Sequence, residues 1–183
     1  MIEPRNITLT DGRRMVIRPL AVTDGEALAS FYADIPPEDG IYYLPPSGRT
    51  RNMALRYAAE ADASADVVLV LADDSGTVHG EAWYRYKGEQ RERATFGICV
   101  LRTAQGCGAG RALMGRLLEI ADESGPAVIE LTVQTENERA RRLYERMGFE
   151  IVKKQMREER EDAPPMPEYA MERRRKHNAD HER

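Results

Sequence analysis

The stretch TAQGCGAGRALM, residues 103–114, holds three glycines within five residues and then continues as a helical pattern. Glycines spaced this closely are typical of backbone that turns with positive φ or passes close to a ligand. A dinucleotide fingerprint needs G-x-G-x-x-G/A, and neither register here ends in Gly or Ala. A P-loop is excluded because no Gly-Lys-Ser/Thr occurs. The remaining pattern is Q-x-x-G-x-G, formed by Gln105, Gly108 and Gly110, and an ordinary strand-to-helix loop is the alternative.

The residues around this loop predict alternating strands and helices. Residues 93–101 read as a strand that feeds the loop, and apolar residues recur at helical spacing from Gly110 onward. Thr135 and Glu138 have capping-box spacing, and Gly148 is placed to end the helix that follows in a left-handed cap. Strands are expected over residues 13–20, 66–73, 77–88, 93–101, 127–133, 149–156 and 167–174, and helices from Thr23 or Asp24, over 51–61, from Gly110 and from Thr135.

A second motif lies downstream of the loop: N-x-x-A-x-x-x-Y-x-x-x-G-F in residues 137–149. With Q-x-x-G-x-G and the order of elements, it resembles the GNAT family of acyl-CoA-dependent N-acetyltransferases. The segments GRRMVIRPL and GEAWYRY are also similar to bacterial protein-lysine acetyltransferases. The resemblance implies an α/β (α+β) GNAT fold, with a central mixed, mostly antiparallel sheet of about six to seven strands and about four helices. One domain is expected over residues 1–175, followed by a flexible tail over 176–183.

Composition narrows the classes of partner. The 183 residues carry a net charge of −4, which does not favour nucleic-acid binding. No apolar run is long enough to cross a membrane, and the first residues do not form a signal peptide. Two cysteines give no disulfide framework, and three scattered histidines have no metal-site spacing. We therefore expect a cytoplasmic protein that binds no metal, membrane or nucleic acid.

The resemblance implies acetyl-CoA as the cosubstrate of the glycine loop. A helix N-terminus offers unpaired N–H groups and a positive dipole end, which suit the pyrophosphate of coenzyme A if side chains stay clear. The strand before the loop would bind the pantetheine arm. Alternatives are a buried thiol at Cys99, a solvated Arg111 and a helix-capping Asn137. The implied cofactor-binding residues are Ile98, Cys99, Val100, Gln105, Gly106, Cys107, Gly108, Ala109, Gly110, Arg111 and Asn137.

Two residues are catalytic candidates. Tyr144 matches the family tyrosine that protonates the departing sulfur, and core packing is the alternative. Many relatives use a strand glutamate to accept the amine proton, but Thr95 occupies that position here. Glu81 is the nearest strand candidate for the base, with a solvent-facing or salt-bridged carboxylate as the alternative. Trp83 and Tyr84 line a substrate wall or pack in the core, and the tyrosines of GIYYLPPSGR are candidate lids for the acceptor site.

The leading interpretation is an N-acetyltransferase that moves an acetyl group from acetyl-CoA to a primary amine by direct attack in a ternary complex. The amine would belong to a protein lysine, a protein N-terminus or a small molecule. A non-catalytic acyl-CoA sensor on the same fold is the alternative. Nucleic-acid binding through RRLYER and ERRRKH is disfavoured because glutamates interrupt the basic residues. Edge strands in such folds often pair, so a homodimer is compatible with the sequence.

Overall fold

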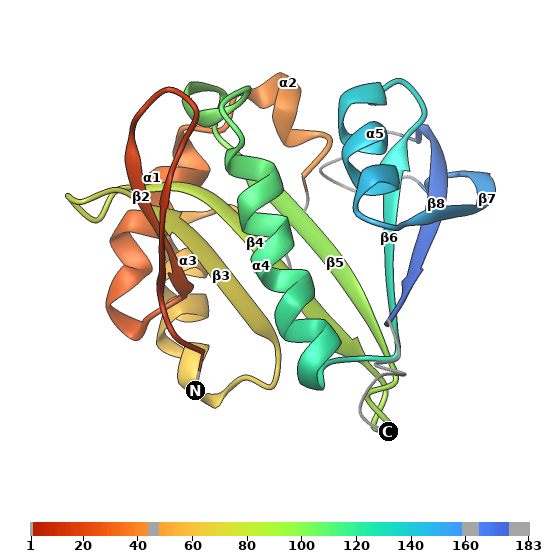
Figure 1. Cartoon of the computed structure of the whole chain (residues 1–183), viewed down its shortest axis with the longest axis horizontal. Coiled ribbons are helices and arrows are strands. Elements are labelled where there is room, and N and C mark those ends of the chain that lie inside the picture. Colours follow the sequence, from red (N-terminus) through yellow and green to blue (C-terminus); the bar gives the residue numbers. More distant parts are fainter. Residues whose placement is uncertain (1, 44–47, 159–164, 176–183) are drawn as a thin grey trace, which may run out of the picture.

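The computed structural model describes residues 2–43, 48–158 and 165–175, which form one eight-stranded sheet with helices on both faces (Figure 1). The strands are β1 (Arg5–Thr8), β2 (Arg14–Pro19), β3 (Val67–Ala72), β4 (Val78–Lys87), β5 (Arg93–Val100), β6 (Val128–Gln134), β7 (Glu150–Met156) and β8 (Pro167–Arg174). The helices are α1 (Gly25–Ala33), α2 (Pro37–Gly40), α3 (Arg51–Ala59), α4 (Ala109–Ser124) and α5 (Glu138–Arg146), with single 3₁₀ turns at Val22–Asp24, Ala61–Ala63 and Arg102–Ala104.

The sheet divides between β5 and β6. Its strand order is β1-β2-β3-β4-β5-β6-β8-β7, and every neighbouring pair is antiparallel except β5 and β6. These two parallel strands pair through Arg93–Thr95 and Val128–Glu130, and within the described residues no pairing between them extends further. Figure 1 shows the two strands diverging from that junction toward the glycine loop. The divergence leaves backbone groups of β5 without a neighbouring strand.

Ion pairs reinforce the short junction. Arg93 of β5 contacts Glu130 of β6, with 3.0 Å between guanidinium and carboxylate, and it also pairs with Glu172 of β8. Lys87 of β4 pairs with the same Glu130. The junction therefore holds both halves of the sheet by side-chain charge as well as by backbone pairing.

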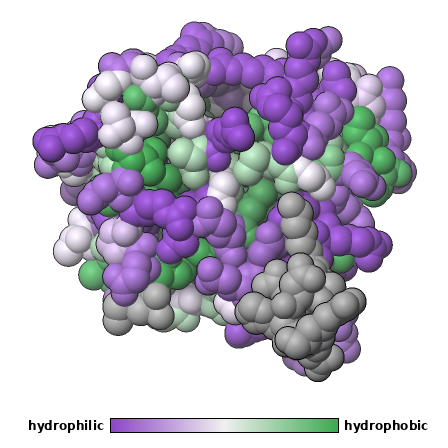
Figure 2. All heavy atoms as spheres, viewed as in Figure 1, coloured by the Kyte–Doolittle hydropathy of each residue, from purple (hydrophilic) through white to green (hydrophobic). Residues whose placement is uncertain are grey.

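Each face of the sheet has its own core. Period-two alternation sends Ile17, Leu69 and Leu71 to the face covered by α4, where Leu113 and Leu117 are fully buried. Val70 and Trp83 point to the other face, where α1 and α3 supply Phe31, Tyr32 and Ala58. Hydrophilic residues cover most of the surface in the view of Figure 2. The sheet thus separates two apolar cores, and β5 leads from it into the glycine loop.

The fold class predicted from sequence is confirmed, with differences in detail. The described residues contain one strand more than expected, because the polar RNIT of β1 has no apolar alternation and pairs as an edge strand. The short α2 lies in a segment that sequence predicts as a loop. The predicted capping box at Thr135 is wrong, since the helix begins after Asn137, whose Oδ1 accepts from the Ala140 N–H at 3.2 Å. The predicted C-terminal tail, residues 176–183, lies outside the described residues.

No helix in the described ranges is both long and apolar enough to cross a membrane. The same residues contain no group of three or more His, Cys, Asp or Glu side chains positioned to hold a metal ion.

Candidate active site

The divergence of β5 and β6 opens a cavity of about 570 Å³. The end of β5, the glycine loop, the first turn of α4 and one side of α5 border it. Of the predicted site residues, the cavity is lined by Ile98, Cys99, Val100, Gln105, Gly106, Gly108, Gly110, Arg111, Asn137 and Tyr144. Glu81, Cys107 and Ala109 do not line it.

The glycine loop presents the start of α4 to this cavity. Gly108 is the N-cap residue of α4 and has φ of +89°, a conformation that residues with a side chain rarely adopt. It offers no capping side chain, so among the described residues nothing satisfies the first N–H groups of the helix. Unpaired N–H groups at the positive end of a 16-residue helix form an anion site.

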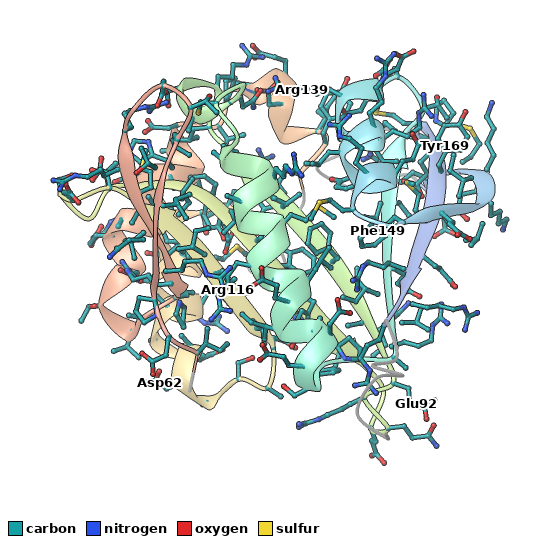
Figure 3. The ribbon with its side chains drawn as sticks, viewed as in Figure 1. Asp62, Glu92, Arg116, Arg139, Phe149 and Tyr169 are labelled. Carbon is teal, nitrogen blue, oxygen red and sulfur yellow. The ribbon has the colours of Figure 1, made fainter. Side chains whose placement is uncertain are left out.

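Gln105 and Cys107 contact other parts of the loop region. The Gln105 amide donates to the Val100 carbonyl at 2.8 Å and accepts from Arg139 at 2.8 Å, so it links the end of β5 to the first turn of α5. Arg139 belongs to α5 (Figure 3). The Cys107 thiol is buried and donates to the Ala104 carbonyl at 3.0 Å. Cys107 and Ala109 therefore pack the loop against the core and expose no side chain to the cavity.

Tyr144 is held in the cavity wall by the end of its own helix. After Arg146, Gly148 takes φ of +88°, and the Phe149 N–H bonds back to the Tyr144 carbonyl at 3.0 Å. This is the predicted left-handed cap, and it brings the Phe149 ring to 6.1 Å from the Tyr144 ring. Phe96 packs edge-on at 6.2 Å. No hydrogen bond to the Tyr144 hydroxyl occurs within the described residues, so it remains available as a donor. Burial, and then the nearby Cys99, raise the pKa of Tyr144 above its ordinary value.

Glu81 is fully buried and is not the solvent-facing or salt-bridged carboxylate that sequence allows as an alternative. The Tyr43 hydroxyl donates to it at 2.5 Å, and the Tyr32 hydroxyl donates at 3.0 Å. No cation forms an ion pair with it in the described part of the chain. Burial raises the pKa of Glu81 to about 7, although both tyrosine hydrogen bonds oppose the shift. A carboxyl group with this pKa exchanges protons at neutral pH.

Cys99 lies opposite Glu81 in the pairing of β4 and β5. Burial, and then the charge of Glu81, raise the pKa of the Cys99 thiol to about 12. The thiol therefore stays protonated at neutral pH and is a poor nucleophile. This favours a role for Cys99 in the cavity wall.

A second cavity, of about 730 Å³, opens among β5, β6, β7 and β8. Trp83, Thr95 and Gly97 line it, while Tyr84 is buried in the core. The Glu168 side chain also lines it and is almost fully buried. The two cavities share six lining residues, which mark where they meet: Tyr42, Tyr43, Ile98, Thr132, Gln134 and Tyr144.

The segment around α2 spans the mouth between the two halves of the sheet. Tyr42 donates to Glu136 of the β6–α5 loop at 2.8 Å, and Arg102 contacts Asp39 at 2.7 Å. On the far side Arg157 donates to the Ile41 carbonyl at 2.9 Å. The sequence patterns indicate no role for Arg139, Gln134 or Tyr32. Arg139 contacts Gln105 and Tyr32 contacts Glu81, which lie 34 and 49 positions away in sequence, and Gln134 lines both cavities. Local patterns do not encode such contacts.

Comparison with known proteins identifies the family of the chain. The sequence profile of the Acetyltransferase (GNAT) family matches residues 27–149. The ribosomal protein bS18-alanine N-acetyltransferase of Haemophilus influenzae is 43% identical over 61 residues, a match that covers 33% of this chain and 41% of that protein. The chain thus spans less than half the length of the curated relatives it matches.

Two solved structures share the fold. The acetyltransferase of GNAT family from Streptococcus pneumoniae superposes with a TM-score of 0.75 at 23% identity, covering 87% of this chain and 98% of that one. The structure of yncA from Salmonella typhimurium with its cofactor acetyl-CoA gives 0.73 at 21% identity, covering 90% and 96%. With the family profile matching two thirds of its length, the chain belongs to the GNAT family of acetyltransferases.

Proposed function

We propose that this protein transfers an acetyl group from acetyl-CoA to a primary amine by direct attack in a ternary complex. The observation that carries the proposal is the meeting of two cavities at Tyr144, because an acyl donor in one can then face an acceptor in the other. The acceptor amine would belong to a protein or to a small molecule. The Haemophilus relative is named for acetylating an alanine of a ribosomal protein. We further propose that residues 1–175 act as one domain.

The first cavity presents hydrogen-bond donors that match the acceptor groups of coenzyme A. The unpaired N–H groups of the first turn of α4 would bind the pyrophosphate, and Gly106, Gly108 and Gly110 place no side chain in their way. Hydrogen bonds to a charged acceptor contribute about 1.5–3 kcal/mol each, so this turn supplies affinity without a lysine. The unpaired edge of β5 over Ile98–Val100 would hold the amide groups of the pantetheine arm. When bound, the cosubstrate supplies a thioester, an acyl group activated for transfer to nitrogen.

The residues of the chain then have two tasks. The Tyr144 hydroxyl, which has no partner among the described residues, would donate a proton to the departing sulfur. Glu81 would receive a proton from the amine, since its raised pKa lets it be ionised and yet basic near neutral pH. The backbone N–H groups near Val100 would polarise the acyl carbonyl.

The test is turnover of acetyl-CoA with a panel of primary amines, measured as the release of free thiol. The panel should hold short peptides with free N-termini, lysine-containing peptides, polyamines and amino acids. We expect thiol release with at least one of these acceptors and formation of the acetylated amine, detected by mass. Tight binding of acetyl-CoA without turnover on any amine would instead identify a non-catalytic acyl-CoA-binding module.

Gly110 gives a test of the cofactor cavity that is independent of chemistry. A Cβ at this position would lie 3.7 Å from Leu143, an ordinary contact, so Gly110→Ala should keep affinity for acetyl-CoA. Gly110→Leu should fill the cavity and weaken binding roughly tenfold or more, measured by calorimetric titration. Gly108 is less suitable, because its φ of +89° would make any side chain strain the backbone. Equal affinity of the Ala and Leu variants would show that acetyl-CoA does not pass Gly110.

We also propose that two copies associate through β7. This strand is an edge of the sheet and exposes Ile151, Val152 and Met156. Antiparallel pairing about Val152 would bring Glu150 of one copy beside the partner's Lys154, so the charges are complementary. We expect the wild-type protein to sediment as a dimer and Val152→Lys as a monomer. A wild-type protein that sediments as a monomer at micromolar concentration would contradict this pairing.

A further inference from the structure

Glu81 does not line either cavity, although it is the candidate proton acceptor. Its side chain is sealed on the side of the sheet covered by α1 and α3. A substrate in the second cavity therefore cannot give a proton to Glu81 directly. A group that both contacts Glu81 and borders the cavities is needed to connect them.

Tyr43 meets this requirement. Its hydroxyl donates to Oε2 of Glu81 at 2.5 Å, and the residue lines both cavities where they meet. Tyr32 is the other hydroxyl donor to Glu81, but it lines neither cavity. Cys99 lines the first cavity beside Glu81, yet no hydrogen bond joins its thiol to that carboxylate among the described residues. Tyr43 is thus the hydrogen-bonded connection from Glu81 to the reaction space.

The hydrogen bonds of Tyr43 leave room for a substrate. A phenolic hydroxyl has one proton to donate and two lone pairs that accept. The proton is directed to Glu81, and one lone pair accepts from the Trp83 indole N–H at 3.1 Å. The second lone pair has no partner in the described structure. An ammonium or amine N–H of the acceptor can occupy it.

We propose that Tyr43 relays the proton of the acceptor amine to Glu81, an inference that rests on the proposed function. The ammonium proton moves to the Tyr43 oxygen while the Tyr43 proton moves to Oε2 of Glu81. The amine becomes neutral, Tyr43 is again a neutral phenol, and Glu81 becomes a neutral carboxylic acid. No tyrosinate forms, which matters because burial, and then Glu81, hold the pKa of Tyr43 well above its ordinary value.

The groups that face Glu81 allow its ionisation to be measured from the pH dependence of activity. Tyr32 of α1, Tyr43, Tyr57 of α3 and Cys99 of β5 surround it. Burial raises the pKa of Tyr57 and of Cys99, so neither thiol nor phenol competes with Glu81 near neutral pH. An acidic limb near pH 7 in the activity profile therefore reports Glu81.

The test compares Tyr43→Phe with Tyr32→Phe in the full chain, using the best acceptor found in the amine panel. Each variant removes one hydroxyl from Glu81 and keeps the aromatic ring, and Tyr43→Phe also removes the acceptor of the Trp83 indole N–H. At pH 7.5 we expect kcat/KM to fall roughly tenfold or more in Tyr43→Phe and less than threefold in Tyr32→Phe. The Tyr43→Phe defect should shrink as the pH approaches the pKa of the amine, because a neutral amine has already lost the ammonium proton that the relay removes.

Three results bear on the proposal. Equal losses in the two variants, or a Tyr43→Phe defect that stays constant with pH, would overturn it and leave Tyr43 a structural partner of Glu81. Melting temperature and affinity for acetyl-CoA, measured for both variants, show whether the folds and cofactor sites match. A wild-type protein that acetylates no amine would overturn the proposed function itself. That result is obtained without the variants, so the two failures can be told apart.

Discussion

Glu81→Gln is expected to lower kcat/KM by on the order of 10³-fold at pH 7.5 while making the protein more stable. The loss of activity follows because glutamine cannot accept the amine proton that Glu81 receives. The substitution keeps the size of the side chain and an acceptor oxygen for Tyr32 and Tyr43. Steady-state kinetics over pH 6–9 would show this loss together with disappearance of the limb near pH 7.

The gain in stability comes from removing a buried charge. Glu81 has a pKa of about 7 in the folded protein, above the ordinary 4.5, so the folded state holds this proton more tightly than the unfolded state. Stability contributed by Glu81 is therefore fully present below about pH 4.5 and lost as the pH rises to about 7. One pKa unit corresponds to about 1.4 kcal/mol, so Glu81→Gln should raise the free energy of unfolding by up to about 3 kcal/mol at pH 8.

Glu168→Gln provides the control for this substitution. Glu168 is also a buried carboxylate, it lines the second cavity, and it accepts from Gln155 at 2.9 Å, but no hydrogen bond joins it to Tyr43 among the described residues. We expect this variant to keep the limb near pH 7. A fully active Glu81→Gln enzyme would mean that Glu81 is only a buried partner for two tyrosines. Urea unfolding at pH 5 and pH 8 separates the stability effect from catalysis.

Tyr144→Phe is expected to lower kcat roughly 10²-fold, the low end for general-acid catalysis. The effect is limited because a thiol has a pKa of about 8.5 and its thiolate already leaves tolerably well. The ring contacts with Phe96 and Phe149 remain, and the hydroxyl has no hydrogen bond to lose among the described residues. Melting temperature and affinity for acetyl-CoA should consequently change little.

A second acyl donor shows whether the loss of activity comes from protonation of the sulfur. An activated ester whose leaving group needs no proton should be used by wild type and Tyr144→Phe at similar rates. The defect with acetyl-CoA would then belong to protonation of the sulfur. Tyr144→Phe that turns over acetyl-CoA normally would return Tyr144 to the role of a core side chain on α5.

The fold was predictable because its signals are local. The continuous apolar run of β3, the helical spacing after Gly110 and the glycine at 148 each depend on neighbours within a few residues. Strand β1 escaped prediction because its RNIT sequence lacks an apolar face, and it pairs only as an edge. The alternative that Asn137 caps the helix is confirmed, and Thr135 does not cap it: two polar residues compete there and only the backbone geometry selects one.

The parts of the candidate site that are contiguous in sequence could be predicted, and the parts formed by contacts between distant residues could not. The glycine loop and the Tyr144 motif are contiguous patterns, so the sequence reveals them. The surroundings of Glu81 depend on Tyr32 and Tyr43, which lie 49 and 38 residues away in sequence. Sequence patterns for β4 could not distinguish a carboxylate facing solvent from one enclosed by two hydroxyls, because its burial depends on α1 and on the segment after α2.

Because only three residue pairs join β5 to β6, we expect the sheet to open as two cooperative units rather than one. Amide hydrogens of β6, β7 and β8 should therefore exchange with solvent through openings that leave β2 to β5 protected. Raising the salt concentration should increase those openings, since Arg93, Glu130 and Glu172 join the units by partly exposed charges. A ligand lying along the free edge of β5 would join the units, so acetyl-CoA should slow exchange on both sides at once. Bound there, acetyl-CoA would take the place of a strand between β5 and β6.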